Sequence, residues 1–191
     1  MLLVALAVLV AIALGGRWIL TRQDPLVVEQ PTGVSLGYRG AGDRQIFVSL
    51  DLQPVRNNSG DPLKLVKAEL LPDPETAAQH WATVSDVRVL TGDVNARAAS
   101  GIWPDDAGGA LSAPKLAGYD LPPDAAVRLL FVVKLPAVAQ SEDEAFSMSQ
   151  RWTKLRLSYD KGGDVEVVDA FTTINLCVPS ASACEGAPAS R

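Results

Sequence analysis

TKLRLSYDKGGDVEVVDAFTTINL, residues 153–176, is the stretch that decides the fold class. Residues 153–159 alternate apolar and polar side chains, which is the period of a strand with one buried face. Residues 160–164 contain two adjacent glycines and predict a tight turn. Residues 165–176 return as a second strand, with a slip in the apolar phase near Val167 that predicts a β-bulge. The stretch therefore predicts an antiparallel hairpin.

Three segments upstream of the hairpin also have the pattern of strands. Residues 45–53 alternate apolar and polar side chains. Residues 63–71 slip in phase between Leu65 and Val66, which predicts a second bulge. Residues 126–135, AVRLLFVVKL, are apolar on both faces and predict a central strand covered on both sides.

The remaining segments complete an all-β prediction. Residues 83–91 are a further strand candidate, and short helices are expected over residues 74–81 and 142–149. Residues 101–118 are rich in Gly, Ala, Pro and Asp and predict a long loop. About seven to nine short strands, separated by turns and without regular helical crossovers, predict an antiparallel sandwich of two sheets.

Three motifs resemble bacterial immunoglobulin-like (Ig-like) domains. LDLQPVRNNSGDPLKL, residues 50–65, resembles their B–C region, and LPPD, residues 121–124, resembles their E–F corner. Residues 152–159 with the following glycine turn resemble their last strand pair. The resemblance implies an Ig-like β-sandwich over residues 23–177, and adhesion or assembly roles by analogy.

The N-terminus, MLLVALAVLVAIALGGRWIL over residues 1–20, is apolar enough to enter a membrane. A helix over these residues would be about 30 Å long, close to the hydrocarbon thickness of a bilayer. We expect residues 1–22 to form a transmembrane anchor or signal-anchor, with Trp18 at the interface and Arg17 and Arg22 reaching the headgroups. The alternative is a cleaved signal peptide, although no basic residue precedes the apolar run.

Two sets of observations favour opposite sides of the membrane for the domain. Arg17 and Arg22 follow the apolar run and, by the positive-inside rule, favour a cytoplasmic domain. The chain nevertheless has a net charge of −5, and its two cysteines, Cys177 and Cys184, are spaced as a disulfide of an exported protein requires. We expect an extracytoplasmic domain, with the cytoplasmic orientation as the alternative. The disulfide would pin the C-terminal tail, residues 178–191, to the last strand.

No motif in the chain predicts catalysis or a cofactor. His80 is the only histidine, and no nucleophile elbow accompanies it. One histidine and two cysteines do not make a typical zinc or copper site, and the paired acids lack the spacing of a calcium loop. The acidic balance argues against nucleic acid as a partner. We expect no catalytic residue, no cofactor and no metal site.

Trp103, in GIWP on the predicted loop, is the candidate partner contact, because exposed tryptophans on loops are common binding hot spots. The alternative is that this loop folds over an edge of the sandwich. Together these features predict a non-catalytic, membrane-anchored extracytoplasmic interaction domain, an accessory or assembly subunit of a larger envelope or membrane complex. The alternatives are a small-ligand or glycan-binding module near Trp103 and Tyr119, and a hydrolase that uses carboxylates alone.

Overall fold

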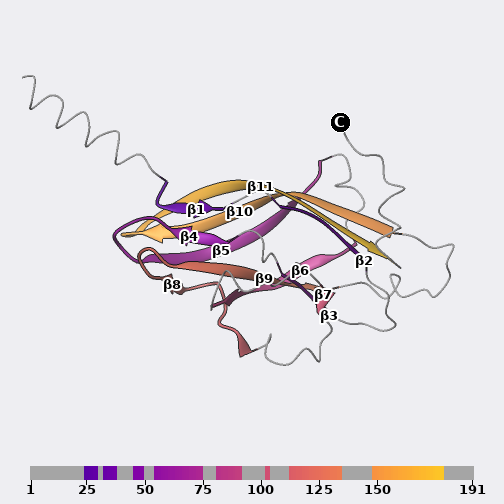
Figure 1. The fold of residues 1–191 in the computed structure, drawn as a ribbon, viewed down its shortest axis with the longest axis horizontal. Coiled ribbons are helices and arrows are strands. Elements are labelled where there is room, and N and C mark those ends of the chain that lie inside the picture. Colours follow the sequence, from indigo (N-terminus) through magenta and orange to yellow (C-terminus); the bar gives the residue numbers. More distant parts are fainter. Residues whose placement is uncertain are drawn as a thin grey trace, which may run out of the picture.

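The computed structural model describes residues 24–29, 32–37, 45–49, 54–74, 81–91, 102–103, 112–134 and 148–178. Within these ranges the chain forms eleven β-strands in two sheets (Figure 1). The predicted all-β class is confirmed. The expected anchor over residues 1–22 and residues 179–191 of the expected tail lie outside the described residues. Across the described ranges, no helix is long and apolar enough to cross a bilayer.

The predicted hairpin is confirmed and is longer than expected. Its strands are β10 (Met148–Lys161) and β11 (Asp164–Val178), which pair in antiparallel register. Gly162 and Gly163 form the turn with φ angles of +68° and +102°. Glycine adopts these positive φ angles without the strain that a Cβ atom would cause, so the sequence fixes the turn at this point.

The hairpin lies at the centre of a five-stranded sheet with the order β2-β11-β10-β5-β8. β5 (Leu63–Pro72) is antiparallel to β10, and β8 (Tyr119–Leu121) pairs with β5. β2 (Thr32–Gly37) runs parallel to β11 and pairs with its residues 172–177. An early strand of the domain is therefore joined directly to its last strand.

The bulge predicted in β5 is confirmed. Ser158 of β10 lies opposite Lys67, but the next residue, Tyr159, lies opposite Leu65, so Val66 is the extra residue. Leu65 is fully buried, whereas Val66 is 39 % exposed on the outer face of the sheet. The slip in the apolar pattern of this segment thus reflects a real change of register.

The second sheet is built around β9 (Ala126–Lys134). β6 (Thr83–Leu90) pairs with β9 over most of the length of β9. β4 (Val55–Asn57) pairs with the first two residues of β9, and β3 (Gln45–Ser49) pairs with its last five. β3 and β4 therefore follow one another along β9, and β9 has the central position that its apolar sequence predicted.

Short strands account for the excess over the seven to nine expected. β1 (Leu26–Val28) pairs with β4, and β7 (Ile102–Trp103) pairs with β3. β7 falls within residues 101–118, where the sequence predicts only loop. Strands of two or three residues are too short to show an alternating pattern, so sequence periodicity does not reveal them.

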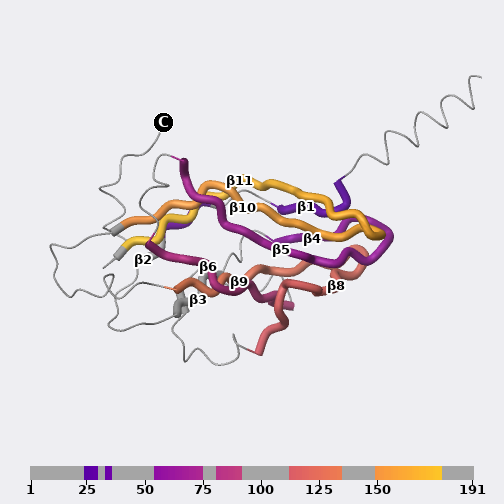
Figure 2. Tube along the Cα trace, turned by 180° about the vertical axis from the view of Figure 1, so that it is seen from behind, coloured from indigo at the N-terminus to yellow at the C-terminus, as the bar shows by residue number. Residues whose placement is uncertain are grey.

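Both sheets contribute side chains to one apolar core, which lies between the two layers visible in Figure 2. Fully buried members from the two sheets are Leu155, Leu157, Ile174, Leu129 and Phe131. Burial of one side chain of this size contributes about 1.5–3 kcal/mol. On the other face of β9, Leu130 and Val132 are also buried and pack against Leu90, so β9 is apolar on both faces for a structural reason.

The bulge expected near Val167 and Val168 is wrong. The register between β10 and β11 is continuous across both residues, and its only shift lies at Trp152–Lys154. Val167 faces outward and is exposed, while Val168 is half-buried on the opposite face. The apparent slip in the sequence comes from apolar residues on both faces of the strand.

The two expected helices lie largely outside the described residues. The helix expected over residues 142–149 cannot extend to its predicted end, because Met148 and Ser149 already belong to β10. Trp81, the predicted last residue of the other helix, is not helical.

Candidate functional site

β11 has two different surroundings along its length. Residues 172–177 lie between β10 on one side and β2 on the other. Residues 164–171 pair with β10 alone among the described strands. Backbone N–H and C=O groups of alternate residues point to opposite edges of a strand, so half of this stretch directs them away from β10. We call residues 164–170 the open edge of β11.

The open edge and the adjoining Phe171 carry exposed apolar side chains. Val165, Val167 and Phe171 are 62 %, 57 % and 64 % exposed. They are two or four residues apart, so they share the outer face of the sheet, with Asp169 between them. Among the other residues whose side-chain burial the structure describes, the one exposed large apolar side chain is Val66 on β5. We call Val165, Val167 and Phe171 the apolar row.

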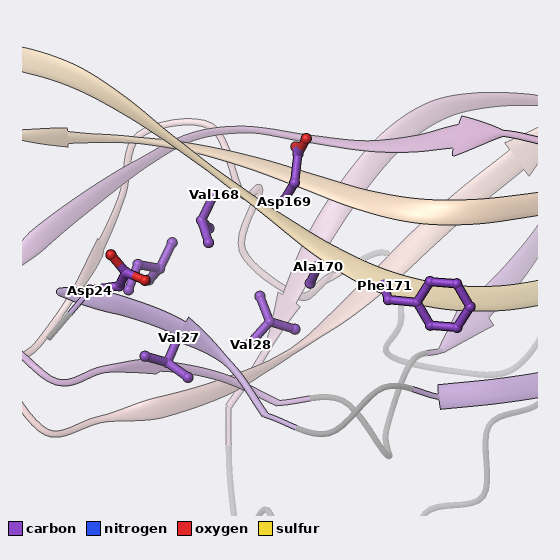
Figure 3. Close-up of a pocket in the computed structure, with 8 residues that line it drawn as sticks. Asp24, Val27, Val28, Val168, Asp169, Ala170 and Phe171 are labelled. Atoms are coloured by element: carbon purple, nitrogen blue, oxygen red, sulfur yellow. The ribbon is translucent and has the colours of Figure 1, made fainter.

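A cavity of about 300 Å³ separates the open edge from β1 (Figure 3). Its walls include Asp24, Val27 and Val28 on one side and Val168, Ala170 and Phe171 on the other. Figure 3 places these side chains along two neighbouring strand segments that belong to different sheets. The side chains between β1 and β11 are therefore mainly apolar inside the cavity, as they are on the outer face of β11.

Asp169 lies on the same outer face as the apolar row, and cationic side chains of β10 compensate its charge. Arg156 donates two hydrogen bonds to it, with Nε to Oδ1 at 2.8 Å and Nη2 to Oδ2 at 2.9 Å, and Lys154 Nζ lies 3.4 Å from Oδ2. The hydrogen bonds from Arg156 are the main cause that lowers the pKa of Asp169 to about 2. The same hydrogen bonds raise the pKa of Arg156. Both groups are charged at neutral pH, and each is paired.

Tyr159 holds the first half of β11 against β10. Its side chain is 3 % exposed, and its hydroxyl donates a hydrogen bond to Glu166 Oε2. Burial raises the pKa of Tyr159 well above its ordinary value, and the hydrogen bond to Glu166 and the charges of Glu166 and Asp24 raise it further. The phenol therefore stays protonated and keeps donating to Glu166.

Asn57 is a buried polar side chain with hydrogen bonds at both ends of its amide, and its role is structural. Its Nδ2 donates to the carbonyl oxygens of Asp61, Leu121 and Pro122 at 2.8, 3.0 and 3.1 Å. Its Oδ1 accepts hydrogen bonds from the backbone N–H and the hydroxyl of Ser59. With both ends of the amide used, Asn57 fixes the turn before β5 and presents nothing to a ligand.

The residues singled out from the sequence do not meet at one place. Trp103 belongs to β7, where its backbone pairs with Phe47 in the sheet opposite the open edge. Cys177 is buried near the end of β11 and is not a free thiol. Its expected partner, Cys184, lies outside the described residues, so the Cys177–Cys184 pairing stays a prediction. Partner contact by Trp103 also stays a prediction.

The expected membrane-interface residues Arg17, Trp18 and Arg22 and the single histidine, His80, also fall outside the described residues. Within the described ranges, no group of three or more His, Cys, Asp and Glu side chains is placed to hold a metal ion. The expectation of no metal and no cofactor for the whole chain stays a prediction.

Sequence reasoning missed the apolar row, although the sequence carried a signal for it. In a strand with one buried face, apolar residues keep one parity. Residues 165 and 167 break that parity relative to Val168 and Ala170. A bulge residue and an apolar outer face both interrupt the parity of the apolar residues. Only the pairing register between the strands distinguishes these two causes.

A comparison with protein-family models finds no match, and a comparison with curated proteins finds none either.

Proposed function

We propose that this protein is a non-catalytic, membrane-anchored extracytoplasmic interaction domain, an accessory or assembly subunit of a larger membrane complex. The observation that carries the proposal is the open edge of β11 with its apolar row. Exposed strand edges pair readily with another chain, and natural proteins usually shorten, charge or cover them. Here the edge is seven residues long, and its outer face is mainly apolar.

The strand order supports an Ig-like sandwich as the scaffold. Ig-like domains place strands A, B, E and D in one sheet and strands C, F and G in the other. The order β1-β4-β9-β6 matches the first sheet, with β3 continuing β4 along β9. The order β5-β10-β11 matches the second sheet. In this assignment residues 121–124 precede strand E, so they are not the E–F corner that they resemble. The open edge belongs to strand G, the last strand.

The geometry favours a protein partner over a small ligand. Peptide recognition by strand addition uses main-chain hydrogen bonds along an open edge and side-chain contacts beside it, and β11 offers both. The neighbouring cavity of about 300 Å³ is at the lower limit for ligand pockets, and its walls are mainly aliphatic. Glycan recognition would instead be expected to use several aromatic side chains, and Phe171 is the only aromatic residue lining this cavity.

The proposed anchor would place the open edge near the membrane. Residues 1–22 almost directly precede Asp24, which lines the cavity and lies close enough to influence Tyr159 beside the hairpin turn. The turn end of β11 is therefore the end of the domain closest to the proposed membrane segment. A partner that docks on the open edge would then be a membrane protein or a protein held close to the membrane.

Photo-crosslinking from the apolar row tests the proposed function. A photoreactive amino acid is placed at Val167 in the full chain in its native membranes, and the matched control carries it at Val66, the exposed valine on β5. We expect a discrete, stoichiometric protein adduct from position 167 and none from position 66. Equal or absent labelling at the two positions would contradict the proposal.

A further inference from the structure

We propose that the partner strand on the open edge of β11 carries a basic side chain at the turn end of the edge and an aliphatic side chain two residues away. Both side chains point inward. The basic side chain meets Asp24 and Glu166, and the aliphatic side chain enters the cavity between β1 and β11. This inference rests on the proposed function, because it names the chemistry of the partner that binds the same surface.

β2 limits the length of the partner strand. It pairs with β11 from Thr172 onward, and the turn at Gly162 and Gly163 ends β11 on the other side. A partner strand that pairs with residues 165–170 therefore stops short of β2 and leaves the surroundings of Phe171 unchanged. Main-chain hydrogen bonds over so short a stretch do not distinguish one sequence from another, so the side chains of the partner strand must supply the selectivity.

The cavity lies where the inward side chains of an added strand would point. Successive side chains of a strand point to opposite faces, so every second one is directed between the two sheets. There the cavity of about 300 Å³ is lined by Val28 of β1 and by Val168 and Ala170 of the open edge (Figure 3). Val168 and Ala170 are only half-buried. An aliphatic side chain from the partner would withdraw them from water.

Two acids at the turn end of the edge lack a cationic partner. Glu166 lies opposite Tyr159, whose buried side chain donates its hydroxyl proton to Glu166 Oε2. Asp24 lines the cavity, and its charge acts on the same phenol. Among the residues that the structure describes, neither carboxylate forms a salt bridge, whereas Asp169 farther along the edge is paired with Arg156. The uncompensated negative charge is therefore at the turn end.

These acids decide which strand can be added. A strand with only apolar inward side chains would exclude water from Glu166 and leave its charge unpaired, which is unfavourable. A Lys or Arg side chain instead forms charge-assisted hydrogen bonds with Glu166 and Asp24, and its aliphatic stem lies along the apolar cavity wall. The position along the edge sets this requirement, so it holds for a parallel and for an antiparallel partner strand.

The same charges disfavour two other occupants of the edge. The open edge of a second copy, DVEVVDA over residues 164–170, contains no basic residue and brings its own acids. An anionic lipid surface would be repelled by the acids as well. Charge complementarity therefore favours a strand of a different protein that carries positive charge.

Charge reversal at Asp24 tests the basic contact. The full chain in its native membranes carries the photoreactive amino acid at Val167, together with Asp24→Lys or with the control Asp120→Lys. Asp120 is an exposed acid on β8, at the opposite edge of the same sheet. We expect the yield of the protein adduct to fall at least about tenfold with Asp24→Lys and to stay unchanged with Asp120→Lys. Equal yields from the two variants would overturn the inference.

Filling the cavity tests the aliphatic contact independently. Ala170→Leu places a larger side chain in the space that the partner would enter, so the adduct yield should fall while thermal stability is kept. Ala126→Leu, at a half-buried position on β9 in the other sheet, is the control and should leave the yield unchanged. Undiminished labelling of the Ala170→Leu chain would show that no partner side chain enters the cavity.

The sequence of the crosslinked segment separates the inference from the proposed function. Tandem mass spectrometry of the adduct should find a Lys or Arg two residues from a Val, Ile or Leu in the labelled segment. A protein adduct whose segment lacks a basic residue, or an adduct with a second copy of this chain, overturns the inference and leaves the docking function standing. The absence of any protein adduct from position 167 overturns both.

Discussion

The two halves of β11 share one strand and one neighbour, β10, but have opposite environments. Residues 172–177 are covered by β2, and Ile174, Leu176 and Cys177 are fully buried there. In residues 164–171, which β2 does not reach, the apolar row is more than half exposed. The apolar row is exposed because it lies on the outer face of the sheet. On the inner face, Val168 and Ala170 are only partly buried, so the comparison teaches that the second neighbour deepens the burial of that face.

The largest expected effect contrasts apolar truncation in the two halves. Ile174→Ala should lower the free energy of unfolding by about 2–5 kcal/mol, because it leaves a cavity in the shared core. Val167→Ala should change it by no more than about 0.5 kcal/mol, because this side chain is 57 % exposed. Urea unfolding of the full chain in mild detergent measures both. Similar losses for the two variants would mean that the open edge is covered within the monomer.

A smaller effect is expected at Tyr159, which ties the open half to β10. Tyr159→Phe removes the hydrogen bond to Glu166 and should cost about 1–2 kcal/mol in the same unfolding assay. Lys161→Ala, at the exposed hairpin turn, is the control and should have little effect.

The hydrogen bond of Tyr159 should also give the protein a pH-dependent stability. The pKa of Tyr159 is raised in the folded state, so the folded chain keeps this proton at a pH where the unfolded chain has lost it. This contribution is complete below about pH 10, the ordinary tyrosine pKa, and is lost as the pH rises further. Stability should therefore decline more steeply above pH 10 in the unsubstituted chain than in Tyr159→Phe. Parallel declines would show that Tyr159 titrates normally.

The smallest effect is expected from the ion pairs on the outer face of the open half. Asp169 has its pKa lowered to about 2 by Arg156, so its contribution is present above the ordinary pKa and is lost as the pH falls from about 4 toward 2. Exposed pairs are screened by water and salt, so Asp169→Asn should cost less than Tyr159→Phe. The variant should also show a shallower loss of stability between pH 4 and pH 2, measured by thermal unfolding. If the loss of stability between pH 4 and pH 2 were the same in Asp169→Asn and the unsubstituted chain, the ion pair between Asp169 and Arg156 would not stabilise the hairpin.

Strands with a long, regular pattern could be predicted from the sequence. Residues 154–159 alternate without exception, and residues 126–135 are apolar apart from Arg128 and Lys134; both segments became central strands. The phase slip at Leu65 and Val66 correctly gave the bulge in β5. In each case a local pattern and the long-range pairing agree, which is the condition under which periodicity is informative.

The other features of the fold depend on pairings between strands, and no local sequence pattern predicts those pairings. β1 and β7 have three and two residues, and the partner of β2 is distant in the sequence, so backbone pairing and not side-chain alternation defines these strands. The open edge of β11 was missed for the same reason, because a sequence does not show where β2 stops along its neighbour. Trp103 drew attention as a large aromatic residue on a predicted loop, whereas its backbone lies in a strand of the other sheet.

The parallel pairing of β2 with β11 has a consequence for the order in which the chain can fold. Residues of β2 and β11 that lie side by side are 140 positions apart in the sequence, as the hydrogen bond from Asn175 to Ser35 illustrates. At a synthesis rate of roughly 5–20 residues per second, β2 emerges from the ribosome on the order of ten seconds before its neighbour exists. During that interval β2 lacks the strand that it pairs with in the folded domain. Closure of the domain is therefore among the last events of its biogenesis, and folding should be slow because of this high contact order.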